Sequence, residues 1–318
     1  MPTVRANGLD IAYTTDGTAG DPLVLLHGAS SSAVEDWAAV RPALRRHFRL
    51  HLVDARGHAG TRWIESPARD GARLDTIGIE TLVADLAAFA DALGLDRFHL
   101  AGFSMGGMTA LRYAVDHADR LLSLVLVGVD IEPEPGSSVA RVMLDPDRIA
   151  RDDPEWAAQL ERRHGPVQGP GTWRRLLPVV VAAMARRPRL TPGELRRVSV
   201  PSLVVCGDRD PFVPVDHAWR LKRQLPDARL LVAPDAAHLV IPTRPDVVSA
   251  AMKAFYGSLG GGRRGTSAWA DRRRAALSDD GSPAPGSATG APFDAAPPEP
   301  APSDPVPPEP VDPLLPDR

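Results

Sequence analysis

Short apolar runs recur along the chain up to about Tyr256, separated by longer stretches that mix apolar and polar positions. A run at Val4 and another over Leu9–Thr14 flank the turn residues 6–8 and predict an antiparallel hairpin. Six further runs are almost continuously apolar, which is typical of strands buried on both faces of a parallel sheet. These runs are Pro22–Gly28, Phe48–Asp54, Phe98–Gly102, Leu122–Gly128, Ser202–Asp208 and Ala228–Ala236.

Segments with helical spacing lie between most of these runs, namely Thr76–Leu93, Met105–His117, Val215–Gln224 and Pro245–Phe255. Strands that alternate with helices predict an α/β fold with a mostly parallel central sheet and helices on both faces. Between Val129 and Ser202 the alternation stops, and the stretches "DPEWAAQLERRHG" and "GTWRRLLPVVVAAMARR" predict two or more helices. We interpret residues 132–198 as a helical cap inserted between two parts of a core, residues 1–131 and 199–258.

The last sixty residues have a different composition. From residue 259 the chain loses its apolar periodicity and becomes rich in Pro, Ala, Ser, Asp and Glu. Such a segment buries too little apolar surface to offset the entropy of ordering it, so we predict a disordered, partly polyproline-like tail at 259–318. The runs "PPEPAP" and "PVPPEP" would also suit polyproline recognition, which makes an interaction tail the alternative hypothesis.

Composition narrows the function further. The chain is 43% hydrophobic with a formal net charge of −3, as expected for a globular protein with no electrostatic attraction to nucleic acid. Its single cysteine, Cys206, rules out an intrachain disulfide and lies in a buried-strand pattern. The N-terminus lacks a secretory pattern and no run of 18 apolar residues occurs, so we expect a cytoplasmic protein that spans no membrane.

The stretch from Gly102 to Gly106, "GFSMG", has the form G-x-S-x-G and lies between a predicted strand and a predicted helix. At such a corner glycines avoid a clash between the crossing strand and helix, and the central serine takes a strained backbone conformation. The hydroxyl of Ser104 would then be exposed at the carboxyl edge of the sheet. The placement therefore predicts that Ser104 is a nucleophile.

With these motifs the chain resembles the α/β-hydrolase family over essentially Val4–Phe255. The family's order of nucleophile, acid and histidine is matched downstream of Ser104 by "CGDRDPFVP" and "DAAHLVIP". The resemblance implies that Asp210 is the acid and His238 the base. Asp208, at the strand end, is a competing acid, and Asp130, after the preceding strand, is a weaker alternative.

A serine hydrolase also needs donors for the developing oxyanion. The resemblance implies that the backbone N–H of Ala29, after the His-Gly pair in "LLHGASSS", acts together with that of Met105. The alternative interpretation of this pair is a turn that ends a strand. "VDARGHAG" is similar to the family's D-x-R-G-x-G segment, except that Ala59 stands where the second glycine is usual, and we interpret Asp54, Arg56 and His58 as structural.

Together these features predict a serine hydrolase that needs no cofactor and cleaves a small-molecule carboxylic ester or lactone through an acyl-enzyme. Carbon–carbon bond hydrolases and cofactor-free perhydrolases of the family share the same active-site residues and remain alternatives. A ligand-binding protein with the same fold is the alternative of another class. The histidines show no metal-ligand spacing, and no phosphate-binding or dinucleotide glycine motif occurs, so we expect neither metal nor nucleotide.

Aromatic residues near these motifs and in the cap are candidates for contact with the substrate, namely Phe103, Trp37, Trp156 and Trp173. In the cap, Leu176, Leu177, Val180 and Met184 fit a pocket and a buried underside equally well. Three arginine pairs, at 162–163, 174–175 and 186–187, are interpreted as a solvated face, with a substrate carboxylate as the alternative partner. Oligomeric state has no signal in the sequence.

Overall fold

A computed structural model describes residues 1–63, 66–67, 73–74, 77–134 and 136–260. Its main sheet has eight strands in the order β1-β2-β4-β3-β7-β8-β9-β10. The pairs β1–β2 and β2–β4 are antiparallel and all the others are parallel, which confirms the predicted α/β fold with its N-terminal hairpin. The strands are β1 Thr3–Ala6, β2 Leu9–Asp16, β3 Pro22–Leu26, β4 Arg49–Val53, β7 Phe98–Phe103, β8 Leu121–Val127, β9 Ser202–Gly207 and β10 Ala228–Ala233.

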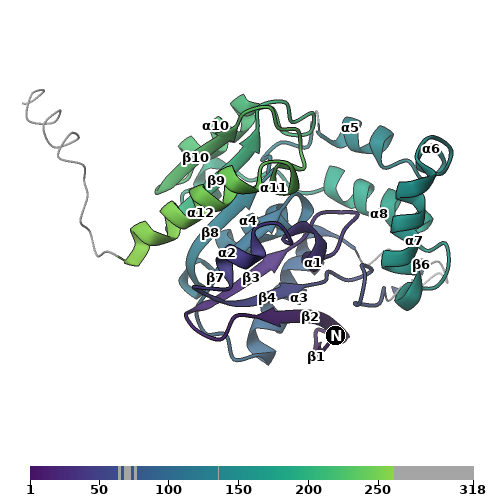
Figure 1. The fold of residues 1–318 in the computed structure, drawn as a ribbon, viewed down its shortest axis with the longest axis horizontal. Coiled ribbons are helices and arrows are strands. Elements are labelled where there is room, and N and C mark those ends of the chain that lie inside the picture. Colours follow the sequence, from purple (N-terminus) through teal and green to yellow (C-terminus); the bar gives the residue numbers. More distant parts are fainter. Residues whose placement is uncertain (64–65, 68–72, 75–76, 135, 261–318) are drawn as a thin grey trace, which may run out of the picture. The chain divides into compact units, whose positions relative to one another are not determined.

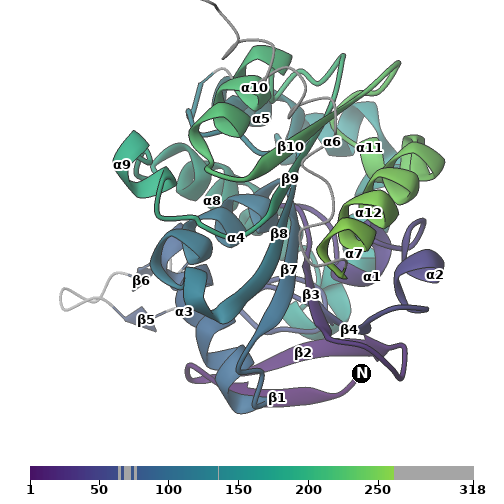
Figure 2. The same ribbon diagram turned by 90° about the vertical axis from the view of Figure 1, so that its left-hand side faces the viewer.

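Helices cover both faces of this sheet (Figures 1 and 2). On one face α3, α4 and α10 bury Leu86, Leu111 and Leu221 against the strands, and on the other α2 and α12 bury Leu44 and Met252. Burial of apolar side chains from two layers on a central sheet provides the main stabilisation of such a fold. The helices are α1 Ala33–Asp36, α2 Arg41–Leu44, α3 Ile79–Ala92, α4 Met105–Asp116, α10 Val215–Gln224, α11 Val240–Thr243 and α12 Pro245–Gly260, with a 3-10 turn at Ala118–Arg120.

Residues 132–198, called the inserted segment below, run between β8 and β9 and contain five helices among their described residues. The two stretches predicted as helices form α7 and α8. Helix α8 packs Leu176, Val180 and Met184 against Met105 of α4 and Ile77 before α3. The helices are α5 Gly136–Met143, α6 Pro146–Asp152, α7 Pro154–Gln168, α8 Trp173–Ala185 and α9 Pro192–Leu195.

Several element boundaries differ from the expected ones. Strand β10 ends at Ala233 because Pro234 has no N–H to continue the ladder. Helix α12 continues to Gly260 and so includes the first two residues of the predicted tail, and the rest of that predicted tail lies outside the described residues. A short hairpin of β5 Ser66–Pro67 and β6 Arg73–Leu74 was not expected from the sequence.

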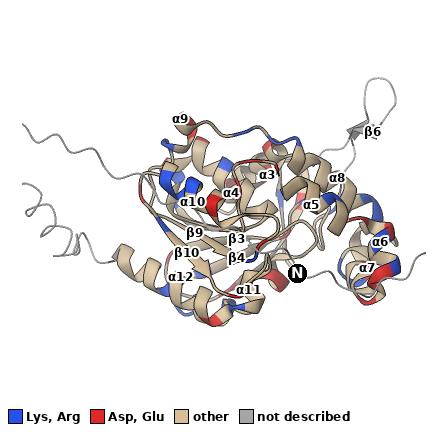
Figure 3. Ribbon diagram, turned by 90° about the horizontal axis from the view of Figure 1, so that it is seen from above, with Lys and Arg blue, Asp and Glu red and all other residues tan. Residues whose placement is uncertain are grey.

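The surface carries mixed charge on the inserted segment, where α6 and α7 show both Lys or Arg and Asp or Glu (Figure 3). Within the described ranges, none of the helices combines the length and the apolar character needed to cross a bilayer.

Candidate active site

Ser104 lies at the corner between β7 and α4 with φ 50° and ψ −116°, in the left-handed region that non-glycine residues rarely adopt. Its N–H donates to Val127 O at 2.8 Å, and its carbonyl accepts from Met108 N at 2.9 Å. A Cβ on Gly106 would lie 2.6 Å from His27 O, so only glycine allows this close crossing of α4 over β3. The predicted strained corner is therefore present, and strain of this kind costs about 1–3 kcal/mol.

His238 follows β10 and directs its ring toward Ser104. Its Nε2 lies 2.9 Å from Ser104 Oγ, although 134 residues separate the two in the chain. The ring stacks at 4.4 Å from Phe212 and at 5.1 Å from Phe103, measured between ring centroids. Gly128 leaves room for it, because a Cβ there would lie 2.9 Å from His238 Cε1. The ring is thus fixed within reach of the serine proton.

Asp210 follows β9 and completes a chain of three side chains. Its Oδ2 accepts a hydrogen bond from His238 Nδ1 at 2.8 Å, and its Oδ1 accepts from Phe212 N at 2.8 Å and Val213 N at 3.0 Å. The Asp210 side chain has no exposed surface. These bonds hold the carboxylate in place and specify the His238 tautomer whose Nε2 can accept a proton.

The two alternative acids lie elsewhere. Asp208 Oδ1 accepts from Ala236 N at 3.0 Å, and this bond lowers the pKa of the exposed Asp208 carboxyl. Asp130 Oδ2 lies 2.6 Å from His217 Nδ1. The structure therefore places only Asp210, of the three weighed carboxylates, in hydrogen-bonding contact with His238.

The two expected oxyanion donors are neighbours of Ser104. Ala29 and Met105 line the same pocket as Ser104 and His238. Met105 is the first residue of α4, where helix N–H groups have no carbonyl partner within the helix. Among the hydrogen bonds of the described residues, none uses the N–H of Ala29 or of Met105. Both are free to donate to a group bound beside Ser104.

The pocket beside Ser104 lies between the sheet edge and the inserted segment, and its walls are mainly apolar. Met108, Phe212 and Val213 come from the core, and the inserted segment adds apolar side chains from α5, the loop after it, and α8, namely Ala140, Leu144, Val180, Val181 and Met184. Of the cap residues weighed in the sequence, Val180 and Met184 line the pocket while they also pack in one cluster with Leu176, which does not line it. Leu177 is buried in a separate cluster.

Three charged residues also line this pocket. Asp130 contacts His217, and Glu132 pairs with Arg220 at 3.3 Å. Arg187 donates to the carbonyls of Met184, Asp130 and Glu132, tying the end of α8 to the loop after β8, and burial lowers the pKa of its guanidinium. The interpretation of the arginine pairs as a solvated face is therefore wrong for Arg187, because it turns into the pocket wall. It is also wrong for Arg163, whose side chain is only 12% exposed and donates to Ser30 O.

The structure does not bring the four expected substrate-contact aromatics to the pocket surface. Trp37 is fully buried, and its indole N–H donates to Leu26 O at 3.1 Å. Phe103 packs beneath His238 and is only 4% exposed. Trp156 and Trp173 pack within the inserted segment. Sequence reasoning missed Phe212 and Leu144 instead, although Phe212 follows the acid by only two residues in "DRDPF".

No group of three or more His, Cys, Asp or Glu is arranged to hold a metal ion within the ranges that the structure describes. Cys206 is buried in β9, and burial next to Asp210 and Asp208 raises the pKa of its thiol to about 12. A thiol held neutral in a strand interior is a packing residue.

Comparison with known proteins finds relatives of this chain. The model of the alpha/beta hydrolase family matches residues 23–251. An N-formylmaleamate deformylase of Pseudomonas putida is 40% identical over 124 residues, which are 39% of this chain and 43% of that protein. The aligned stretch thus spans less than half the length of this relative.

Longer alignments and the fold agree with this match. A 2-hydroxy-6-oxononadienedioate/2-hydroxy-6-oxononatrienedioate hydrolase of Burkholderia vietnamiensis is 28% identical over 261 residues, covering 72% of this chain and 85% of that one. The crystal structure of the enol-lactonase from Burkholderia xenovorans LB400 superposes with a TM-score of 0.64 at 23% identity, covering 80% of this chain and 100% of the other. At this identity the likeness shows the fold.

Proposed function

The chain belongs to the α/β-hydrolase family, and from that premise we propose that it is a serine hydrolase cleaving a carboxylic ester or lactone. Ser104 is the nucleophile, His238 the general base and acid, and Asp210 the residue that orients His238. The Ala29 and Met105 N–H groups form the oxyanion hole. The observation that carries this proposal is the hydrogen-bonded chain from Ser104 through His238 to Asp210 at a positive-φ corner.

In the first half of the reaction, Ser104 Oγ bonds to the substrate carbonyl carbon while His238 Nε2 takes the hydroxyl proton. The carbonyl π electrons move to oxygen, and the N–H groups of Ala29 and Met105 stabilise that charge. The tetrahedral intermediate then collapses, the bond to the leaving oxygen breaks, and Nε2–H protonates the alkoxide. Ionised Asp210 stabilises the imidazolium that exists between these two transfers.

Water completes the cycle. His238 Nε2 takes a proton from water as its oxygen adds to the acyl carbonyl, and the same two N–H groups bind the second oxyanion. Collapse breaks the bond to Ser104 Oγ, which regains its proton from Nε2, and the carboxylic acid leaves. No cofactor enters this sequence of steps.

The inserted segment acts as a cap in this proposal. Its residues Leu144, Val180 and Met184 line the pocket together with the core residues Met108 and Phe212. Apolar walls on both sides favour an acyl or alcohol group with apolar surface. An apolar wall also limits water near Ser104, which strengthens the oxyanion interactions.

Carbon–carbon bond hydrolysis is the second candidate, favoured by the relative from Burkholderia vietnamiensis, whose name makes it a hydrolase of 2-hydroxy-6-oxo dienedioates and trienedioates. The same side chains would serve, with a carbanion-like leaving group protonated before release. Steady-state assays on a vinylogous 1,5-diketone acid and on esters distinguish the two, because the preferred class has the larger kcat/KM. A non-catalytic binding protein would turn over neither class.

The test of the proposal compares wild type and Ser104→Ala on short p-nitrophenyl esters and on lactones. Loss of a nucleophilic serine costs as much as about a millionfold in kcat. We expect wild-type turnover with a burst of p-nitrophenol from acyl-enzyme formation, and no activity above background in the variant. Equal activity in both proteins would refute Ser104 as the nucleophile.

A further inference from the structure

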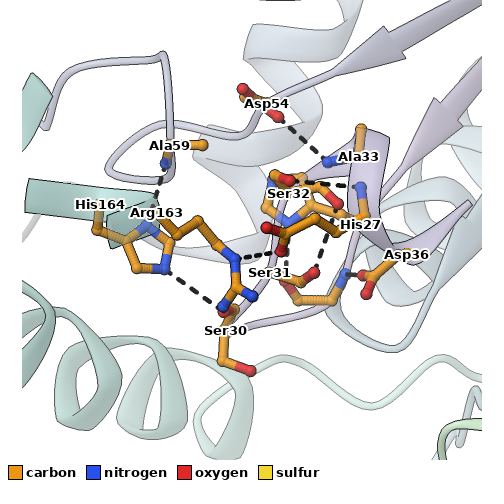
Figure 4. Close-up of polar contacts among 12 residues, drawn as sticks. His27, Ser30, Ser31, Ser32, Ala33, Asp36, Asp54, Ala59, Arg163 and His164 are labelled. Carbon is orange, nitrogen blue, oxygen red and sulfur yellow. Dashed lines mark hydrogen bonds and ion pairs between the residues drawn. The ribbon is translucent and has the colours of Figure 1, made fainter. Parts of the chain in front are cut away.

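Helix α7 of the inserted segment holds the loop that carries Ala29. Arg163 Nη1 donates to Ser30 O at 2.6 Å, and His164 Nε2 lies 3.4 Å from the same oxygen (Figure 4). Ala59 N donates to His164 Nδ1 at 3.1 Å, which leaves the ring proton on Nε2, facing Ser30. Two consecutive residues of α7 therefore donate to one carbonyl of this loop.

Arg163 is itself fixed in place. Its Nε also pairs with Glu35 in α1, and its side chain is only 12% exposed. A planar guanidinium with one edge on a carboxylate and another nitrogen on a carbonyl has little rotational freedom. The contact with Ser30 is thus a bridge between the inserted segment and the core, and not a solvated surface interaction.

The two peptide groups before Ser30 are held by core residues. His27 Nδ1 lies 2.7 Å from Gly28 O, which belongs to the same peptide plane as the Ala29 N–H. His58 Nε2 lies 2.8 Å from Ala29 O. Burial is the main cause that lowers the pKa of both histidines, which favours neutral rings. Because a neutral ring has one N–H and His58 Nδ1 also lies 3.0 Å from Arg56 O, His58 holds Ala29 O as the tautomer protonated at Nε2.

Three successive peptide planes are therefore fixed by side chains, the first two from the core and the third from α7. Neighbouring peptide planes share an α-carbon. Loss of the bonds to Ser30 O would therefore allow more rotation about the backbone of Ser30, the residue next to Ala29. An oxyanion hole acts through donors that are already aligned when the charge develops.

We propose that Arg163 and His164 are positioning residues that align the Ala29 N–H for the oxyanion, so that seating of α7 on the core completes the oxyanion hole. The proposal rests on the serine-hydrolase function above and names a contribution of the inserted segment to the transition state in addition to its pocket wall. The donors act on the tetrahedral state through Ser30 and do not contact the substrate.

The test replaces Arg163 by Met in the whole chain. Methionine keeps an apolar stem and removes the groups that donate to Ser30 O and Glu35. The matched control is Arg162→Met, because Arg162 is the exposed neighbour on α7. With p-nitrophenyl butyrate we expect Arg163→Met to lower kcat by about 10- to 100-fold, less than outright removal of an oxyanion donor, with KM within about twofold. Arg163→Lys, which keeps a single charged donor nitrogen, should lower kcat less than Arg163→Met does.

A second readout separates positioning from general damage. Phenylboronic acid forms a tetrahedral adduct with an active-site serine, so its inhibition constant should rise in Arg163→Met by about the same factor as kcat falls. The proposal would be overturned if Arg163→Met had the same kcat and inhibition constant as Arg162→Met. A higher KM for Arg163→Met with unchanged affinity for the boronic acid would also overturn it.

Two further variants keep the outcome decisive. If Arg163→Met fails to fold, Glu35→Gln is the test variant, because it weakens the ion pair that holds Arg163 in place. It should shift kcat and boronic-acid affinity together by a smaller factor, and unchanged values would overturn the proposal. Activity retained by Ser104→Ala would instead refute the serine-hydrolase function, whereas loss in Ser104→Ala with normal Arg163→Met refutes only the positioning role.

Discussion

Asp130 Oδ2 lies 2.6 Å from Nδ1 of His217 and thereby forms a second acid–histidine pair at the same edge of the sheet as Asp210 and His238. Asp130 follows β8 and Asp210 follows β9, the next strand in the sheet. Both carboxylates are buried. Only Asp210, however, bonds to the histidine whose other nitrogen faces Ser104.

This arrangement predicts that the Asp→Asn substitution lowers kcat far more at Asp210 than at Asp130. Asp210→Asn should lower kcat by about 10³- to 10⁴-fold, because an amide can fix the wrong His238 tautomer and cannot stabilise the imidazolium. Asp130→Asn should keep kcat within about tenfold, since Asn Oδ1 can still accept from His217 and the bond lost, from Glu132 N, lies outside the chain of Ser104, His238 and Asp210. Steady-state rates on one ester decide between the acids, and a greater loss in Asp130→Asn would contradict the assignment.

Local patterns in the sequence predicted the framework of the site. The strand–serine–helix corner follows from an apolar run that ends at glycine, whereas Asp210 and His238 were assigned from the family's order of nucleophile, acid and histidine. Both residues come just after predicted strands, and parallel strands place their carboxyl ends at one edge of the sheet.

The pocket walls could not be predicted in the same way. Helical spacing indicates that one face of α8 is buried, but it does not distinguish Val180 in the pocket from Leu177 in a packing cluster. Trp37 was a candidate for substrate contact as an aromatic residue near the motifs, yet its indole N–H donates to Leu26 O inside the core. Arg163 was expected on a solvated face, because nothing in the sequence indicates where α7 docks.

Close packing of α4 on β3 predicts that Gly106→Ala destabilises the protein. The new Cβ would lie 2.6 Å from His27 O and 2.7 Å from Leu26 Cβ, and neither backbone nor a strand side chain can yield without moving α4. Overpacking of this kind costs about 1–3 kcal/mol of unfolding free energy, and a shift of α4 would also displace Met105 N–H and lower kcat. Urea unfolding and ester kinetics measure the two effects.

The control for this substitution is Gly257→Ala in α12, where a Cβ would have no neighbour within 4 Å. Alanine has less conformational freedom than glycine in the unfolded chain and is more favourable in a helix. This variant should therefore be unchanged or up to about 1 kcal/mol more stable, with normal kcat. A Gly106→Ala protein as stable as Gly257→Ala would show that the corner tolerates a methyl group.

Burial of Asp36 predicts a pH-dependent contribution to stability. Desolvation raises the pKa of its carboxyl from 3.8 to about 6, although Gly28 N donates to Oδ2 at 2.7 Å. Between these two values the folded protein binds more protons than the unfolded chain, so the unfolding free energy falls as pH rises. Asp36→Asn removes this titration while Oδ1 can still accept from Gly28.

We therefore expect the stability of Asp36→Asn relative to wild type to increase from pH 4 to pH 6 by roughly 2–3 kcal/mol and to stay constant above pH 7. Urea unfolding at several pH values measures this difference. In Asp208→Asn the difference should instead fall slightly from pH 4, because a hydrogen bond from Ala236 N lowers the pKa of Asp208 and wild type gains stability as the pH rises. A flat difference for Asp36→Asn would mean that its carboxyl titrates normally.

Ala59 occupies a position where the family resemblance led us to expect glycine, and its φ of 40° lies in the left-handed region. The methyl group makes this conformation unfavourable by roughly 1–2 kcal/mol, whereas glycine adopts it readily. Ala59→Gly should therefore increase the unfolding free energy by about 0.5–1 kcal/mol, after the added freedom of the unfolded chain is subtracted. The Ala59 N–H bond to His164 should persist, and kcat should not change.

The same chemical change in a helix should have the opposite sign. Ala87 lies in the middle of α3, where glycine is less favourable than alanine by about 1 kcal/mol, so Ala87→Gly should lower the unfolding free energy by at least that amount. Both variants delete one methyl group, and the backbone conformation sets the opposite signs, with the packing of Ala87 against the core adding to its loss. Destabilisation of both in urea would mean that the Ala59 methyl group contributes packing that outweighs the strain.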